Sequence, residues 1–314
     1  MATPETTELH VTESLDGARL DKATVELADG KLSRARVKKA IEAGEVRVNG
    51  RRRAKGSLVS KGDVITLESE LTQDDAAAPE PGAPLVVRFE SPAVVVVDKP
   101  AGQPTAPLRP GETGTLANAI VGHYPETAGV GYAPREPGLL HRLDTDTSGL
   151  VVVARDRETF EELKDALKDG RIEKRYLLVC ASDGLADDGT IAFPLASHPK
   201  DQRRVLACVH PRDVMRNAPR PASTTYRVVR RAGDYALVEA DVSKALRHQI
   251  RAHFAAIEHP LVGDVLYGGP TVPGLARHAL HASRVTFHGD PALAFDVESE
   301  LPAELAALVP AGET

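Results

Sequence analysis

The stretch HRLDTDTSGL, residues 141–150, leads directly into the apolar run VVVA of residues 151–154. The apolar run predicts a buried strand, yet the residues before it are mostly polar or charged. A polar group that is buried without a partner costs about 1 to 3 kcal/mol. Because Thr and Ser hydroxyls can hydrogen-bond the backbone of their own loop, we expect a rigid turn that holds a carboxylate in place.

Two carboxylates in this stretch could take part in chemistry. Asp144 and Asp146 are two residues apart. In an extended segment they would share a face and could act together, like the paired carboxylates of a glycosidase. In a turn, only one of them would need to point into a site. The residues alone leave both arrangements open.

The segments around this stretch predict the fold class. Helices are predicted over 115–125 and 156–170, and strands over 85–90, 93–100, 149–156, 173–180, 203–209, 224–231 and 235–243. A short turn joins the last two strands, which must therefore be antiparallel. Because strands and helices do not alternate strictly, we predict an α+β domain with a mixed, mostly antiparallel sheet over residues 85–308.

The N-terminal part of the chain predicts a separate, small α/β module over residues 15–70. It contains a helix that ends at Gly44, a turn at Asn49-Gly50 and a strand over 64–67. A tail of residues 1–14 precedes the module. Residues 71–84 are rich in Asp, Ala, Pro and Gly, a composition typical of a flexible linker.

Basic residues crowd the second helix of this module and the turn that follows it. Few acidic residues are interleaved among them, so we favour a surface that binds nucleic-acid phosphates over an ordinary solvated surface. The residues of this predicted RNA-binding cluster are Arg34, Arg36, Lys38, Lys39, Arg51, Arg52 and Arg53.

The composition is that of an ordinary globular protein. The chain has 314 residues, is 42% hydrophobic and carries a net charge of -6, so a nucleic-acid partner would need a local basic face. No apolar run is long enough to span a membrane, and the N-terminus does not resemble a secretory signal. We expect a monomer in the cytoplasm, with no membrane partner. Cys180 and Cys208 form no CxxC motif and are expected to be reduced.

The segment HQIRAHFAAIEH, residues 248–259, predicts a helix with Ile250, Phe254 and Ile257 facing the core. Its three histidines are five and six residues apart, which does not place them on one helical face, so we expect no metal site. Arg247 and Arg251 would lie four residues apart on one side. They would repel each other unless an anion, either a phosphate or a carboxylate, lay beside them.

Together these motifs carry a family resemblance. HRLDTDTSGL is similar to the HRLDxxTSGL signature of the RluA-type pseudouridine synthases at every fixed position. Other segments follow the order of the same family, and the N-terminal module resembles the RNA-binding module of ribosomal protein S-four. These further segments are VVVVDKPAGQPT at 94–105, EKRYLLV at 173–179, HQIRAHFAAIEHPLVGDVLYG at 248–268 and ALHASRVTF at 279–287.

The resemblance implies an enzyme that isomerises uridine in RNA to pseudouridine without a cofactor or metal. It assigns Asp144 as the catalytic residue and Arg251 as the cationic partner that keeps Asp144 ionised. Tyr176 is implied to pack on the uracil and is also a candidate acceptor for the proton that leaves the ring. His141, Arg142 and Arg247 are further candidates for RNA contact, whereas His248 and His281 are expected to be structural. The fused module favours large-subunit ribosomal RNA as the substrate, with transfer RNA second.

One departure from the family pattern keeps other readings open. The family usually has TGRxHQIR, whereas this chain has KALRHQIR at 244–251, so the contacts with substrate could differ. A non-catalytic RNA-binding or ribosome-assembly protein is one alternative. Independently of this departure, the two carboxylates leave open a hydrolase that uses Asp144 and Asp146 together to cleave a glycosidic bond.

Overall fold

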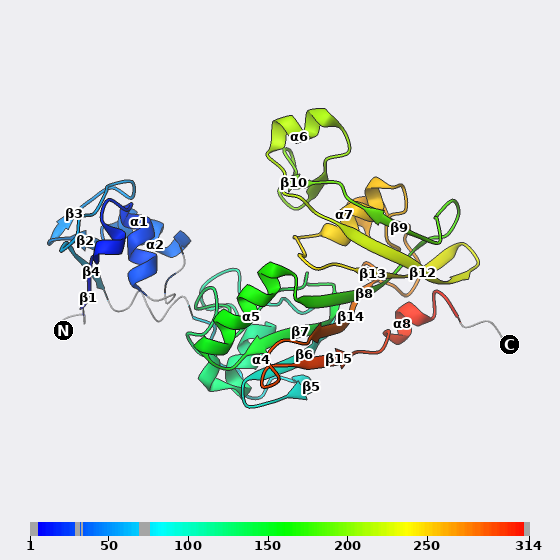
Figure 1. Ribbon diagram of the computed structural model, residues 1–314, viewed down its shortest axis with the longest axis horizontal. Coiled ribbons are helices and arrows are strands. Elements are labelled where there is room, and N and C mark those ends of the chain that lie inside the picture. The colour runs from blue at the N-terminus through cyan, green and yellow to red at the C-terminus, as the bar shows by residue number, and fades with distance from the viewer. Residues whose placement is uncertain (1–5, 29–31, 33, 69–75, 311–314) are drawn as a thin grey trace. The chain divides into compact units, whose positions relative to one another are not determined.

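A computed structural model of the chain describes residues 6–28, 32, 34–68 and 76–310 (Figure 1). Two compact units make up the chain. One comprises Met1–Leu85, Thr105–Leu140 and Val153–Phe160, and the other Val86–Pro104, His141–Val152 and Glu161–Thr314.

The N-terminal elements form a small sheet with two helices. The sheet has the order β1-β4-β2-β3 with antiparallel pairing, and Asn49 and Gly50 both have positive φ in the predicted hairpin turn. Leu20, Val37 and Ile65 belong to a hydrophobic cluster whose buried members all lie between residues 11 and 67. The elements are β1 (Thr6–His10), η1 (Glu13–Leu15), α1 (Leu20–Leu27), α2 (Arg34–Ala43), β2 (Val46–Val48), β3 (Arg51–Arg52) and β4 (Val64–Glu68).

Residues 71–75 of the predicted linker lie outside the described residues. Residues 78–83 are held by hydrogen bonds around helix α4 (Leu116–His123). The Asn118 side-chain amide donates to the carbonyl oxygen of Ala78, and the amide of Glu80 donates to the carbonyl of Asn118. The boundaries expected for the tail, module, linker and catalytic domain remain predictions.

Nine strands among the described residues form the main sheet, in the order β5-β6-β7-β14-β8-β13-β12-β9 with β15 also paired to β14. Strands β7 and β14 pair in parallel, while the remaining registered pairs are antiparallel. The predicted α+β class is therefore confirmed. The strands are β5 (Val86–Glu90), β6 (Val94–Lys99), β7 (Ser148–Ala154), β8 (Ile172–Ala181), β9 (Asp188–Ile191), β12 (Thr224–Ala232), β13 (Tyr235–Asp241), β14 (Leu280–Phe287) and β15 (Phe295–Glu298).

The glycine of the TSGL motif has a structural reason. Gly149 has φ 115°, and a Cβ at this position would overlap the backbone of Ala282, its partner in β14. A residue without a side chain therefore allows the start of β7 to approach β14 closely. This pairing fixes the end of the polar stretch that precedes β7.

The helices largely follow the sequence pattern. Helix α5 (Arg157–Asp169) has Asp156 as its cap, which accepts from the amide of Thr159 at 2.9 Å. None of the helices in the described ranges is long and apolar enough to cross a membrane. The others are η2 (Pro125–Thr127), α6 (Pro211–Asn217), α7 (Gln249–Ala256), η3 (Val265–Tyr267) and α8 (Ala303–Ala306).

The position of Arg247 was predicted wrongly. Helix α7 begins at Gln249, and His248 has a left-handed backbone with φ 52°. Arg247 therefore precedes the helix and does not share a helical face with Arg251. Ile250 and Phe254 are buried as expected.

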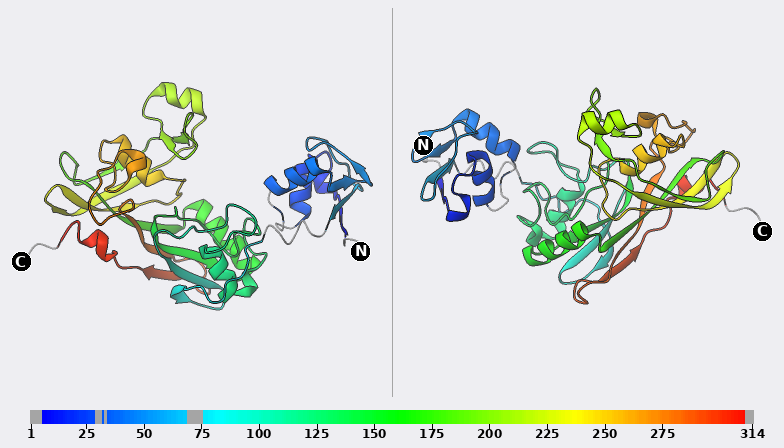
Figure 2. Two further views of the ribbon diagram at one scale, coloured as in Figure 1. Left: turned by 180° about the vertical axis from the view of Figure 1, so that it is seen from behind. Right: turned by 45° about the horizontal axis from the view of Figure 1, so that its top comes forward.

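A short hairpin stands away from the main sheet. Strands β10 (Leu195–Ser197) and β11 (Val205–Ala207) pair with each other and, with α6, project from the unit that contains the main sheet (Figures 1 and 2). At its base, Leu195 and Val205 pack with Ala252 of α7 and with Tyr267. We call these two strands and their connecting loop the β10–β11 hairpin.

Candidate active site

Lys99 holds the turn before β7 through hydrogen bonds to backbone carbonyls. Its fully buried ammonium donates to the carbonyl oxygens of Pro100, Gln103 and Thr145 at 2.9, 2.8 and 2.9 Å. The amide of Gly102 also donates to the Thr145 carbonyl, at 2.9 Å. Burial lowers the pKa of Lys99 to about 8. Lys99 thus ties the end of β6 to the turn that carries Asp144.

Two histidines bind the hydroxyls at the other end of the turn. Thr147 Oγ1 lies 2.7 Å from His278 Nε2, and Ser148 Oγ lies 2.9 Å from His281 Nδ1. His281 Nε2 lies 3.1 Å from Ser299 Oγ, so both of its ring nitrogens are used. The sequence predicted that the hydroxyls of this loop bond its own backbone. Thr147 and Ser148 instead contact His278, just before β14, and His281 of β14. The turn is therefore rigid because several distant segments hold it.

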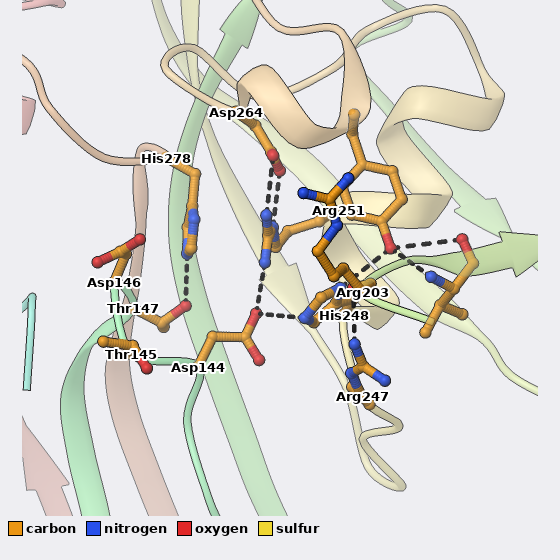
Figure 3. Close-up of polar contacts among 12 residues, drawn as sticks. Asp144, Thr145, Asp146, Thr147, Arg203, Arg247, His248, Arg251, Asp264 and His278 are labelled. Carbon is orange, nitrogen blue, oxygen red and sulfur yellow. Dashed lines mark hydrogen bonds and ion pairs between the residues drawn. The ribbon is translucent and has the colours of Figure 1, made fainter. Parts of the chain in front are cut away.

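Asp144 meets the expected cation. Its Oδ2 accepts a hydrogen bond from Arg251 Nη1 at 2.8 Å (Figure 3), which confirms the predicted contact. Arg251 Nε and Nη2 donate to the two oxygens of Asp264 at 2.7 and 2.9 Å. Burial opposes the charge of Arg251, but the bonds and charge of Asp264 together with the charge of Asp144 outweigh it and raise its pKa. The guanidinium is therefore a permanent cation at this position.

The imidazole of His248 faces the same oxygen of Asp144. Its Nε2 is 3.6 Å from Asp144 Oδ2, and its Nδ1 is 3.1 Å from the hydroxyl of Tyr267. The Tyr267 ring also lies 5.2 Å from the Arg251 guanidinium carbon, a cation–π distance. Within the described residues, no hydrogen bond or ion pair reaches the other oxygen of Asp144, Oδ1. One oxygen is thus anchored and the other is open.

Tyr176 is buried on β8 with 6% of its surface exposed. Burial, and after it the negative charge of Asp144, raise the pKa of its hydroxyl. The phenol is therefore protonated at neutral pH, and its ring lies within electrostatic range of the Asp144 carboxylate.

Asp146 does not share the site with Asp144. It is exposed, and Figure 3 shows its carboxylate pointing away from Asp144, Arg251 and His248. Its backbone oxygen accepts from Arg277 at 3.3 Å. This geometry gives no support to a paired-carboxylate hydrolase.

The three other residues of this unit that were predicted to contact RNA, His141, Arg142 and Arg247, have different surroundings. His141 Nε2 accepts from the amide of Val152 at 3.3 Å, and burial lowers its pKa to about 3, so it is a neutral acceptor beside β7. Arg142 is exposed. Arg247 is exposed as well, but its Nη2 donates to the carbonyl oxygens of Gln202 and Arg203 at 3.0 and 2.6 Å. His141 and Arg247 therefore both have intramolecular partners.

The basic cluster of the N-terminal module is largely exposed. The guanidinium of Arg52 lies against Gly44, just after α2, so the turn region and the helix adjoin. Lys55 pairs with Glu42 of α2 at 3.2 Å. Arg36 is half-buried, whereas the exposed members of the cluster are Arg34, Lys38, Lys39, Arg51, Arg52 and Arg53.

The three histidines of the 248–259 segment point to different partners. His248 faces Asp144, His253 lies 2.9 Å from both Thr224 Oγ1 and the Phe193 carbonyl, and His259 lies 3.1 Å from the Ala181 carbonyl. In the part of the chain that the structure describes, no three potential metal ligands gather in one place.

Comparison with known proteins adds independent findings. Residues 93–256 match the model of the RNA pseudouridylate synthase family, and residues 27–65 match the S4 domain. The protein from Haemophilus ducreyi named ribosomal large subunit pseudouridine synthase D is 33% identical over 320 residues, covering 97% of this chain and 94% of that protein. Its namesake from Nitrosomonas europaea is 33% identical over 317 residues, covering 98% and 88%.

A solved structure shares the fold. The structure titled Human RNA Pseudouridylate Synthase Domain Containing 1 matches with a TM-score of 0.54 at 24% identity, covering 70% of this chain and 86% of that chain.

Proposed function

We propose that this chain, which belongs to the RNA pseudouridylate synthase family, converts uridines of large-subunit ribosomal RNA to pseudouridine. Asp144 is the catalytic residue of the proposed reaction. The contact between Asp144 and the buried Arg251 carries this proposal. The names of the relatives from H. ducreyi and N. europaea support a ribosomal substrate. No observation favours a transfer-RNA target or a protein that only binds RNA.

The reaction requires a carboxylate held ready in a site that admits a flipped base. The bond between uracil N1 and ribose C1′ breaks and a bond from C5 to C1′ forms, while N1 gains a proton and C5 loses one. A base inside a stem must leave the stack first, at a cost of a few kcal/mol. Asp144 is the reacting carboxylate, and its unanchored oxygen Oδ1 faces the substrate.

Arg251 orients this carboxylate. Its Nη1 donates a hydrogen bond of 2.8 Å to Asp144 Oδ2. Asp264 holds the guanidinium with two hydrogen bonds, which fixes its plane. Arg251 can then bind Asp144 Oδ2 without rotating.

Tyr176 supplies the surface on which the uracil packs. Stacking of a base on an aromatic ring contributes about 1 to 3 kcal/mol, which offsets much of the cost of flipping. Its raised pKa keeps the hydroxyl protonated. This favours the packing role over a role as the group that accepts the C5 proton.

The S4 domain provides the grip on the RNA backbone. Its exposed basic cluster on α2 and β3 suits phosphate binding. We assign residues 15–70 to this module, 71–84 to the linker and 85–308 to the catalytic domain. A cytoplasmic location and a monomeric state complete the proposal.

Pseudouridine mapping of ribosomal and transfer RNA, from cells with and without the gene, tests this function. We expect discrete sites to disappear from large-subunit ribosomal RNA and to return with the wild-type gene but not with Asp144→Asn. Sites lost only from transfer RNA would contradict the proposed substrate. Sites restored by Asp144→Asn would contradict the proposed catalytic residue.

A further inference from the structure

A chain of polar contacts links the β10–β11 hairpin to the reacting carboxylate. The backbone amide of Val205 donates to the Tyr267 hydroxyl oxygen at 2.8 Å. That hydroxyl lies 3.1 Å from His248 Nδ1, and His248 Nε2 lies 3.6 Å from Asp144 Oδ2 (Figure 3). Tyr267 and His248 are both largely buried, with their rings packed edge to face at 5.8 Å. Each link is therefore held in place by its surroundings.

The single proton of the Tyr267 hydroxyl can point in two directions. It can be donated to the Val205 carbonyl at 3.3 Å or to His248 Nδ1 at 3.1 Å. In the first case, a neutral His248 would carry its proton on Nδ1, and the lone pair of Nε2 would face the Asp144 carboxylate. In the second case, Nε2 carries the proton and presents an N–H group to that carboxylate. Only the second arrangement is attractive at both ends.

We propose that Tyr267 is a positioning residue for the reaction, because its hydroxyl fixes His248 in the tautomer that directs Nε2–H at Asp144. This inference rests on the proposed role of Asp144. His248 then directs its N–H at Oδ2 from 3.6 Å, beside the hydrogen bond that Arg251 donates to the same oxygen, and Oδ1 is left as the free oxygen. Because His248 is neutral, it adds a donor without adding a second cation.

The same hydroxyl links the hairpin to His248. The Val205 amide donates to the oxygen of Tyr267 and so holds this oxygen beside the hairpin, whichever acceptor takes the hydroxyl proton. Val205, Leu195 and Ala252 pack around the Tyr267 ring. A displacement of the hairpin would therefore loosen the donor that faces Asp144.

Several charged groups surround His248 and bear on its protonation. Burial lowers its pKa below the ordinary value, the negative charges of two carboxylates raise it, and two guanidinium groups lower it. These charged groups are Asp144, Arg251, Arg247 and Asp264. Since burial is the largest of these effects, His248 is neutral at pH 8, where its tautomer matters.

The variant Tyr267→Phe tests the proposal, because it keeps the ring that lies 5.2 Å from the Arg251 guanidinium and removes only the hydroxyl. We expect kcat at pH 8 to fall about fivefold, the effect of losing one hydrogen bond between neutral groups, with a smaller change in KM. The loss should shrink as the pH falls, because protonated His248 carries N–H on both nitrogens. An unchanged kcat at pH 8, or an equal loss at every pH, would overturn the proposal.

The variant His248→Gln separates this role from simple packing. The Gln amide nitrogen lies near the position of Nε2 and donates to Asp144 without needing a tautomer. We expect the addition of Tyr267→Phe to His248→Gln to cause no further loss in kcat beyond that of His248→Gln alone. A full second loss in the double variant would show that Tyr267 acts by another route.

The matched control is Tyr226→Phe. Tyr226 is also buried, packs against Phe254 at 5.4 Å and makes no hydrogen bond among the described residues through its hydroxyl. Removal of the Tyr226 hydroxyl should leave kcat and the pH profile of kcat unchanged. A loss equal to that of Tyr267→Phe would overturn the specific role.

The tautomer of His248 can also be measured directly, without an activity assay. Nitrogen-15 NMR of the full-length protein distinguishes the two neutral histidine tautomers, and His248→Gln identifies the signal of His248. We expect protonated Nε2 at pH 8 in the wild type and a shift toward protonated Nδ1 in Tyr267→Phe. Protonated Nδ1 in the wild type would overturn the inference even if the enzyme were active, whereas turnover by Asp144→Asn would contradict only the proposed function.

Discussion

The two oxygens of Asp144 have different surroundings, and this asymmetry is the central feature of the site. Oδ2 contacts Arg251 and His248, while Oδ1 has no polar partner among the described residues. A carboxylate held by one oxygen keeps its orientation, yet still presents a reactive atom. Asp146, two residues further along the chain, is exposed and points away from Arg251 and His248.

Replacing Arg251 with lysine should separate charge from geometry. Lysine keeps a positive charge but cannot bind Asp264 through two parallel bonds and Asp144 through a third. We expect kcat to fall at least about tenfold with nearly unchanged RNA affinity, measured by steady-state kinetics and filter binding. Arg284→Lys is the matched control, because Arg284 also pairs with two carboxylates, Asp296 and Glu298, but lies at the surface. Equal activity of the two variants would contradict the geometric role.

Only some of the residues around Asp144 could be predicted from the sequence. The family resemblance assigned Asp144 and named Arg251 as its cationic partner, and the structure shows their contact. Asp264, His248 and Tyr267 were missed as partners. Their spacing in the chain has no period, and the left-handed backbone of His248 and the turn at Gly263, not local propensity, bring them to Asp144.

At the scale of elements, the site depends on distant segments that hold one turn. Lys99 at the end of β6 binds the carbonyl of Thr145, and His278, just before β14, binds the hydroxyl of Thr147. The turn is therefore stable only when β6, β7 and β14 have assembled. Formation of the site is thus part of the folding of the sheet.

His278 predicts a pH dependence of stability. Burial lowers its pKa to about 4, below the usual value of 6.5. Between these values the unfolded chain binds a proton that the folded chain does not, so the free energy of unfolding falls as the pH falls through this range. From pH 7.5 to pH 5 this loss should be about 2 kcal/mol.

Urea unfolding of the wild type and of His278→Gln at both pH values measures this effect. Glutamine does not titrate, so the variant should lose less stability on acidification, while other groups contribute equally to both proteins. Parallel pH dependence of the two unfolding energies would refute a buried, neutral His278.

The strands and helices were mostly predictable because their apolar periods are clear. The alternating pattern of β8 and the amphipathic pattern of α5 show this well. The start of α7 was not predictable, because the positive φ of His248 interrupts a pattern that reads as continuous. Residues 203–209 read as a strand of the main sheet, yet β11 pairs with β10 in the separate hairpin, which hydrophobicity alone cannot distinguish.

At the scale of the whole molecule, the chain combines a reaction site with an S4 domain. The net charge is negative, so the exposed basic cluster of the module is a local feature of the surface. The matches to two families predict a division of labour in which the module grips phosphates and the catalytic domain acts on a base.

Neutralising three exposed residues of the cluster tests that division. Lys38→Gln, Lys39→Gln and Arg51→Gln together should weaken RNA binding and reduce the slope of log affinity against log salt by about 2, since each phosphate contact contributes about 0.7 to 0.9. Lys61→Gln is the control, because Lys61 pairs with Glu13 in the same module. An unchanged salt slope in the triple variant would count against the cluster as a phosphate grip.

The most direct measurement is pseudouridine formation by purified Asp144→Asn and Asp146→Asn, on large-subunit ribosomal RNA from cells that lack the gene. Each substitution removes one negative charge and keeps nearly the shape of the side chain. The two positions are two residues apart in the chain. We expect no product from Asp144→Asn, a rate close to wild type from Asp146→Asn, and equal RNA affinity for both. Product formed by Asp144→Asn at the wild-type rate would contradict the assignment of Asp144 as the catalytic residue.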